Sequence, residues 1–227
     1  MKNPWISLPE TPPFVLADDE QIILNFNNIV KSQYRVHLEI LPEPYVGNPE
    51  AKIVLLNLNP GFYERNEIFG LGHDYFRQAS RANLAHACQE YPFFHLDPRN
   101  SGSPGDVWYR QKFRSLIDQF GSKKVAEEFF VIEYFPYVTE KKIAHRLRIP
   151  SQAYSFYLVE QAMRRNALIV QMRSKREWQE AVPELTSYHH YYVLRNPQNT
   201  TISVNNCPDG YPEILKILNS KTFLFPS

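Results

Sequence analysis

Residues 51 to 61, AKIVLLNLNPG, combine an almost unbroken apolar run with a turn sequence. A run without alternating polar positions is typical of a strand buried on both faces, as parallel strands are beneath helices. Pro60 has no N–H to donate to a sheet and Gly61 allows backbone conformations closed to other residues, so the strand should end at Asn59. We therefore expect the central strand of an α/β sheet, with Asn59 at the carboxyl end, where such sheets bind ligands.

Asn59 has a second interpretation that concerns only the backbone. The side chain of Asn often closes a β-turn, and Asn-Pro-Gly is a common turn sequence. Both a ligand-binding amide and a turn-closing amide are compatible with residues 51 to 61.

The second half of the chain alternates between two kinds of hydrophobic pattern. Apolar runs predict strands at 129–134, 168–172 and 191–194, and helical periodicity predicts helices at 151–165 and 174–182 between them. Ser174 and Glu177 have the spacing of a capping box, which favours a helix directly after the second of these strands. With the strand before Asn59, this order predicts a three-layer α/β/α sandwich around a central sheet of about four mostly parallel strands.

Further helices are expected outside this alternation, at 17–34, 76–90, 106–120 and 211–219. Gly121 is the natural C-terminal stop of the helix at 106–120. The chain of 227 residues suits one domain, and we expect a single α/β domain over residues 1–227. Residues 1–16 contain four prolines without a hydrophobic period, which predicts an N-terminal arm on the surface.

The cysteine content and the hydropathy indicate the compartment. Cys88 and Cys207 are too few for a disulfide framework or for a four-cysteine zinc or iron–sulfur site. The chain has no basic and apolar leader, and no window approaches the ~18 apolar residues of a membrane span. The histidines lack the spacing of metal ligands. We expect a soluble, cytoplasmic protein without a membrane segment, a metal or a cofactor.

Polar segments follow the predicted strands at the carboxyl edge of the sheet. The last predicted strand is followed by Asn196-Pro197, so it resembles the strand that ends in Asn59-Pro60. If both turns lie in one cleft, their two amides are placed to grip a heterocycle or to hold a water molecule. The alternative is that the two turns are unrelated, because a chain with 18 prolines repeats Asn-Pro by chance.

These residues resemble the uracil-DNA glycosylase superfamily, in particular its mismatch-specific branch. In that branch a first strand ends in Gly-x-Asn-Pro-Gly and a last strand in Asn-Pro-Ser; here the corresponding segments are Asn57 to Gly61 and Asn196 to Gln198. Residues 104–111, PGDVWYRQ, also resemble the helix start that follows the first motif. The resemblance covers about residues 40 to 220. Asn57 replaces the Gly, Gln198 replaces the Ser, and no carboxylate follows the first strand as in the most active branches.

The resemblance implies hydrolysis of the N-glycosidic bond of a base extruded from DNA. Asn59 would hold the attacking water and Asn196 would steady the leaving base. The expected base-binding residues are Phe62, Phe69, Glu133 and Gln198. Structural roles are the alternative for the aromatic residues and for Glu133. Aromatic side chains beside strand ends more often belong to the core, and Glu133 can bond a loop amide.

Basic side chains follow two of the predicted strands, although the net charge of the chain is only +1. Lys141, Lys142, Arg146 and Arg176 are expected to contact the DNA backbone, because Lys and Arg position phosphates without reading sequence. A solvated helix face is the ordinary explanation of such a cluster.

Three classes of function remain open from the sequence. The first is a glycosylase acting on a damaged or mismatched base in DNA. The second is a nucleobase-, nucleotide- or DNA-binding module that kept the pocket without catalysis, which the missing carboxylate favours. The third is a protein-interaction subunit that uses the aromatic loops at 62–76 and 91–105.

Overall fold

The protein is described here by a computed structural model that covers residues 1–62, 73–143 and 146–220. Its centre is a five-stranded sheet in the order β1-β3-β2-β4-β5. The strands are β1 (Tyr45–Gly47), β2 (Ile53–Asn57), β3 (Phe129–Glu133), β4 (Leu168–Gln171) and β5 (Tyr191–Val193). β2 pairs in parallel with both β3 and β4, so the prediction that the strand before Asn59 is central is confirmed.

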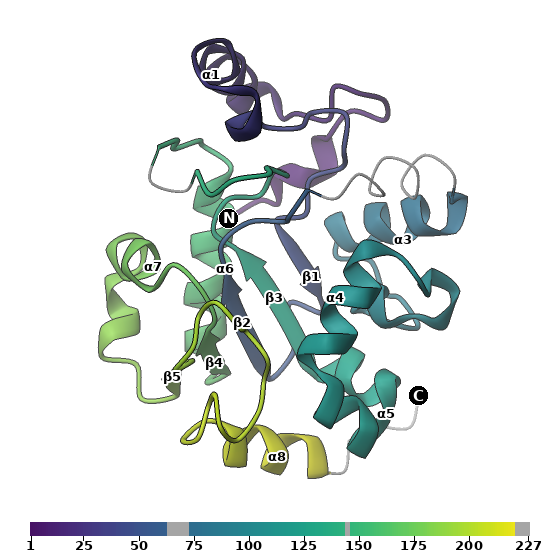
Figure 1. The fold of residues 1–227 in the computed structure, drawn as a ribbon, viewed down its shortest axis with the longest axis vertical. Coiled ribbons are helices and arrows are strands. Elements are labelled where there is room, and N and C mark those ends of the chain that lie inside the picture. The colour runs from purple at the N-terminus through teal and green to yellow at the C-terminus, as the bar shows by residue number, and fades with distance from the viewer. Residues whose placement is uncertain (63–72, 144–145, 221–227) are drawn as a thin grey trace.

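The helices follow the predicted order with shifted ends. They are α1 (Ala17–Ile29), α3 (Asp74–Leu84), α4 (Pro104–Lys112), α5 (Arg114–Glu128), α6 (Gln152–Arg164), α7 (Lys175–Ala181) and α8 (Tyr211–Asn219). In Figure 1, α7 lies on one side of the sheet and α4 and α5 lie on the other. The fold is therefore mixed α/β with a mostly parallel sheet. No helix among the described ranges has both the length and the apolar character that crossing a bilayer requires.

Alternate side chains of the central strands enter two separate hydrophobic clusters. Val54 and Leu56 of β2 pack in one cluster, which includes residues of α1, α6 and α7. Ile53 and Leu55 pack in the other, which includes residues of α4, α5 and α8. Because successive side chains of a strand point to opposite faces, both faces of β2 are buried. This burial explains the unbroken apolar run in the sequence.

The structure corrects the predicted number of strands, because β1 adds an antiparallel edge beside β3. Gly47 ends β1 with a φ of +111°, and an ideal Cβ there would lie 2.4 Å from the carbonyl oxygen of Phe129. The close approach of the two backbones therefore requires glycine. The three prolines and Gly47 of residues 38–49 predict only a segment that leads into the central strand, since a three-residue strand carries little hydrophobic pattern.

Two helix predictions are also corrected. The helix expected at 106–120 is divided at Phe113, and it begins earlier, where the Ser103 side chain accepts a hydrogen bond from Asp106 N at 3.1 Å. Gly121 has a φ of 80° but α5 resumes after it, so this glycine forms a kink and not the end of the helix. Ser174 has a left-handed backbone with a φ of 58° and makes no capping hydrogen bond, so the capping-box prediction is wrong.

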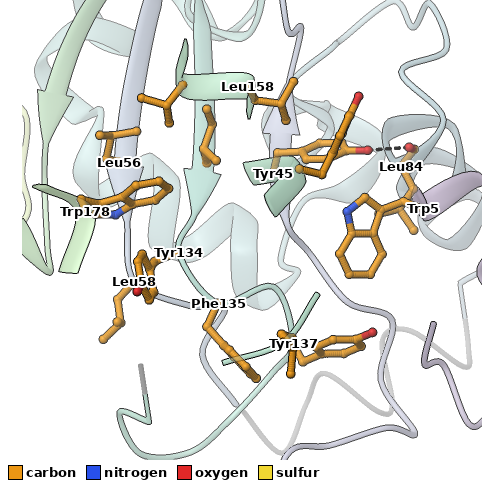
Figure 2. Packing of buried hydrophobic residues seen from close by; sticks show 14 of the residues in the cluster. Trp5, Tyr45, Leu56, Leu58, Leu84, Tyr134, Phe135, Tyr137, Leu158 and Trp178 are labelled. Carbon is orange, nitrogen blue, oxygen red and sulfur yellow. Dashed lines mark hydrogen bonds between the residues drawn. The ribbon is translucent and has the colours of Figure 1, made fainter. Parts of the chain in front are cut away.

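The N-terminal segment packs into the core, which corrects its description as a surface arm. Trp5 is 2% exposed and meets Tyr137 edge-on, with 5.7 Å between ring centroids. Figure 2 shows Trp5 near the hydrogen bond between Tyr45 Oη and the carbonyl oxygen of Leu84, which is 2.6 Å long. The four prolines of this segment therefore occur in a chain that wraps the core, where Trp5 and Leu8 anchor it.

Candidate functional site

A cavity of about 770 Å³ lies at the carboxyl ends of β2 and β3. Its walls come from the end of β2 and the turn after it, from α3, from the start of α4, and from residues 39–43 and 138–142. These segments are far apart in the sequence, and the parallel sheet brings them to one edge. The position agrees with the rule that open α/β sheets bind ligands outside the carboxyl ends of their strands.

Asn57 and Glu133 form a buried pair that lines the cavity. They are the last residues of β2 and β3 and face each other in the strand register. Asn57 Nδ2 donates a hydrogen bond to Glu133 Oε1 at 2.9 Å. The two residues are 4% and 1% exposed, yet Asn57 Oδ1 and Glu133 Oε2 are buried without a hydrogen-bond partner among the described residues. Unsatisfied polar atoms of this kind are rare in proteins and mark a place where a ligand or water can bind.

Burial raises the pKa of Glu133 to about 8. The hydrogen bond from Asn57 opposes this rise, the neighbouring carboxyl of Glu43 adds to it, and Arg173 lowers it. The desolvation of the charged form is the largest of these causes. At neutral pH Glu133 is therefore largely a neutral carboxylic acid, which is able to donate a hydrogen bond as well as accept one.

Asn59 lines the same cavity, and its amide orientation is determined by its neighbours. Asn59 Nδ2 donates to Thr139 Oγ1 and to the carbonyl oxygen of Pro60, both at 2.9 Å. Thr139 Oγ1 donates in turn to the carbonyl oxygen of Lys141 at 2.9 Å, so it must accept from Asn59. The amide oxygen Oδ1 of Asn59 accepts no hydrogen bond from the part of the chain that the structure describes. Asn59 therefore closes its turn through one end of the amide and leaves the other end available.

A second acid lies in the cavity, together with a histidine. Glu43 Oε2 and His95 Nε2 are 2.8 Å apart. His95 is 3% exposed, and its ring stacks on Tyr109 with centroids 5.4 Å apart. Gly105 lies against the imidazole, because a Cβ at this glycine would be 2.2 Å from His95 Nδ1. The histidine is thus held by packing, and it holds the carboxylate.

Aromatic side chains form part of the cavity wall. Phe76 of α3 and Trp108 and Tyr109 of α4 line it. Trp108 and Tyr109 meet edge to face, with centroids 4.6 Å apart. Surfaces of this kind suit a flat heterocycle, since stacking on aromatic rings contributes roughly 1–3 kcal/mol per base.

The structure does not bring Asn196 or Gln198 to this cavity. Both are exposed, and Asn196 Oδ1 accepts from Gln198 N at 3.0 Å and from Asn199 N at 3.1 Å, as in a simple turn. The physical reason is the strand order: β4 separates β5 from β2, which places the two strands about 10 Å apart. The expectation that both Asn-Pro turns share one cleft is therefore not met.

The predicted stacking residues are also placed elsewhere or lie outside the described ranges. Phe62 is half-buried and stacks on His37, with 4.2 Å between centroids, and it does not line the cavity. Phe69 lies outside the described residues. Two other aromatic residues, Phe135 and Tyr137 after β3, are fully buried in the core, where Tyr137 Oη donates to Asp19 Oδ2 at 2.8 Å.

The four predicted backbone-binding residues divide into two groups. Lys141 and Lys142 are exposed and line the cavity. Arg146 lies over the ring of Tyr34, with its guanidinium carbon 4.2 Å from the centroid. Arg176 is on α7, pairs with Glu180 at 3.6 Å, and does not line the cavity.

Several cavity residues were not expected from the sequence. Glu43 stands between two prolines, and His95 occurs in an irregular aromatic stretch, so neither has a local signal. Arg173, by contrast, belongs to the basic segment after β4 that the sequence places at this edge of the sheet, and it lines the cavity. The resemblance of residues 104–111 to a glycosylase helix start was the one signal that pointed toward Trp108 and Tyr109.

Searches of protein-family models, of curated proteins and of solved structures found no match to the chain. Within the described ranges, no group of three or more His, Cys, Asp or Glu side chains is arranged to hold a metal ion. The function is therefore inferred from the geometry of the cavity.

Proposed function

We propose that the protein is a uracil-DNA glycosylase-like hydrolase that cleaves the N-glycosidic bond of a damaged or mismatched base extruded from DNA. The proposal includes the finer fold, a three-layer α/β/α sandwich of that superfamily. The two hydrophobic clusters on opposite faces of the sheet, each with its own helices, support this fold. The first motif, residues 57–61, begins at the end of the central strand and lines the cavity, and this position supports the function.

The observation that carries the proposal is the pair of unsatisfied buried atoms on two residues that line the cavity. Asn57 Oδ1 offers an acceptor, and the carboxyl group of Glu133 offers a donor through Oε2. A nucleobase edge has an adjacent donor and acceptor, so it complements both atoms at once. Such a ligand would remove the penalty of about 1–3 kcal/mol that each unsatisfied buried group imposes.

The chemistry assigned to Asn59 is the positioning of water. Its amide is held by Thr139 and Pro60, so the available Oδ1 has a definite direction in the cavity. A water molecule bound there would be oriented toward the sugar of a base seated on the Asn57 and Glu133 pair. Positioning of this kind lowers a barrier without any proton transfer by the amide.

Lys141 and Lys142 are suited to phosphates on either side of an extruded nucleotide, since both are exposed where they line the cavity. The free cysteines Cys88 and Cys207 are consistent with a reducing, cytoplasmic setting.

The test is a set of oligonucleotides that each carry one uracil, hypoxanthine or other damaged base in single-stranded, paired or mismatched form. Glycosylase activity leaves an abasic site that alkali converts to a strand break. Release of one class of base by the wild type, lost in Asn59→Ala, supports the proposal. Saturable binding of free bases without release from any oligonucleotide would replace it with the binding-module alternative. Absence of both would point to a protein-interaction subunit.

A further inference from the structure

Glu43 lines the cavity from the segment just before β1, which continues the pairing of β1 with the chain at the end of β3. Glu43 N donates to the carbonyl oxygen of Pro136 at 2.9 Å, and Glu133 N donates to that of Pro44 at 2.9 Å. The backbone at Glu43 is therefore tied to the chain that follows β3. This places a second carboxyl group beside Glu133, at the same edge of the sheet as Asn59.

The two carboxyl groups have different partners. Glu133 is fully buried and is bonded to a neutral amide, whereas Glu43 is 21% exposed and contacts the imidazole of His95. Two acids in one cavity with such different surroundings are suited to different roles.

The contact with His95 leaves half of the Glu43 carboxylate available. Oε2 is 2.8 Å from His95 Nε2, and Oε1 has no hydrogen-bond partner within the residues that the structure describes. His95 is itself confined between Tyr109 and Gly105. The available oxygen therefore has a restricted position in the cavity.

We propose that Glu43, oriented by His95, is the carboxylate that assists hydrolysis in this cavity, a role that the first motif leaves unfilled because Asn59 stands at its centre. The inference rests on the proposed glycosylase function. Glu43 Oε1 accepts a proton from the attacking water as the water oxygen bonds to the anomeric carbon. The bond from that carbon to the base nitrogen breaks, and its electron pair leaves with the base, which then takes up a proton from solvent water. The negative charge of Glu43 also stabilises the cationic sugar that forms on the way.

His95 is a positioning residue for Glu43, and Gly105 provides the space that the imidazole occupies. Replacing Gly105 with Ala would push the imidazole away from its place, because the added Cβ would overlap the ring. The change should act on Glu43 through His95, without removing any polar group from the cavity.

The test compares two stable abasic-site analogues in an oligonucleotide, a cationic pyrrolidine and a neutral tetrahydrofuran. The pyrrolidine resembles the charged sugar, so the wild type should bind it tighter than the tetrahydrofuran by about tenfold or more, through the nearby carboxylate. Glu43→Gln should abolish that preference while it keeps affinity for the tetrahydrofuran within about twofold. Glu213→Gln is the control, because Glu213 is paired with Lys216 on α8 at 2.6 Å and does not line the cavity.

The outcomes separate this inference from the proposed function. A preference for the pyrrolidine that Glu43→Gln retains would overturn the role of Glu43 alone. Equal binding of the two analogues by the wild type would also overturn it, and binding of neither would overturn the proposed function as well. If Glu43→Gln does not fold, Gly105→Ala takes its place. It should reduce the preference and leave tetrahydrofuran binding intact, and an unchanged preference would overturn the inference.

Discussion

Asn57 and Glu133 end adjacent parallel strands in register, and a hydrogen bond of 2.9 Å joins their side chains. The carbonyl oxygen of Asn57 also accepts a bond from Trp178 Nε1 at 2.7 Å, which anchors the end of β2 to α7. In Figure 2 the Trp178 indole packs near Leu56, the residue before Asn57. The polar pair lines the cavity at the end of a strand that is tied to α7.

The ionisation of Glu133 should make stability depend on pH. Its pKa is raised by burial from 4.5 to about 8, so between these values the unfolded chain loses a proton that the folded chain keeps. The stability that Glu133 contributes is full below pH 4.5 and is lost as pH rises to about 8. The free energy of unfolding of the wild type should fall over this range relative to Glu133→Gln, by at most about 1.4 kcal/mol per pH unit.

Urea denaturation of both proteins across this pH range measures the difference. Glu160→Gln is the control, because the side chain of Glu160 is exposed on α6 and its ion pair with Arg164, at 3.9 Å, lies on the surface. A stability difference between the wild type and Glu133→Gln that does not change with pH would show that Glu133 is ionised in the folded protein.

Gly47→Ala should strongly destabilise the protein. The substitution combines a φ of +111° with a Cβ 2.4 Å from a backbone oxygen, so we expect a loss of about 2 kcal/mol or more. Gly102→Ala is a matched control, since Gly102 has a φ of +84° with nothing within 4 Å, and it should lose about 1 kcal/mol. Thermal or urea unfolding gives both values. Equal losses would mean that β1 does not approach β3 as closely as described.

Parts of this fold were predictable because they depend on local hydrophobic pattern. The apolar run identified the central strand, although β2 ends at Asn57 and not at the predicted Asn59, and the pattern at 211–219 gave the bounds of α8. β1 was not predictable, because three residues pair with a strand about 85 positions later and carry no pattern of their own.

The site was predictable only where it continues a local motif. Asn59 was expected at the end of the central strand and Glu133 inside the strand at 129–134, and both line the cavity. The contact of Asn57 with Glu133 depends on strand register, and the distance of Asn196 from Asn59 depends on strand order. Neither property is encoded in the residues next to a turn, so two similar Asn-Pro sequences ended in unrelated places.

Lys141 and Lys142 should account for part of the salt dependence of DNA binding. Substitution of both residues with Ala should make the plot of the logarithm of the binding constant against the logarithm of the salt concentration less steep. The slope should change by about 1 for each phosphate that a lysine no longer neutralises. Arg176→Ala should leave the slope unchanged, because Arg176 pairs with Glu180 outside the cavity. Fluorescence anisotropy at several salt concentrations measures the slopes. Equal slopes in all three proteins would assign the two lysines to an ordinary solvated surface.

Thr139→Val should lower turnover without a large change in binding. The substitution keeps the shape of the side chain but removes the oxygen that accepts from Asn59 Nδ2 at 2.9 Å. The amide of Asn59 would then be free to rotate, and loss of positioning reduces kcat by about tenfold to 100-fold. Steady-state kinetics on a cleaved oligonucleotide should show this fall in kcat with KM within about threefold. A change confined to KM would mean that Thr139 supports binding and not positioning.

The most direct test of the proposed function is single-turnover release of free base from a damaged oligonucleotide by the wild type and by Asn59→Ala, followed by mass spectrometry. The wild type should release the base. Asn59→Ala should bind the same oligonucleotide within a few-fold and release the base about 100-fold more slowly, since a water-positioning group acts mainly in the transition state. Equal rates of release by the two proteins would show that Asn59 only closes its turn and would contradict the assignment of the cavity as the catalytic site.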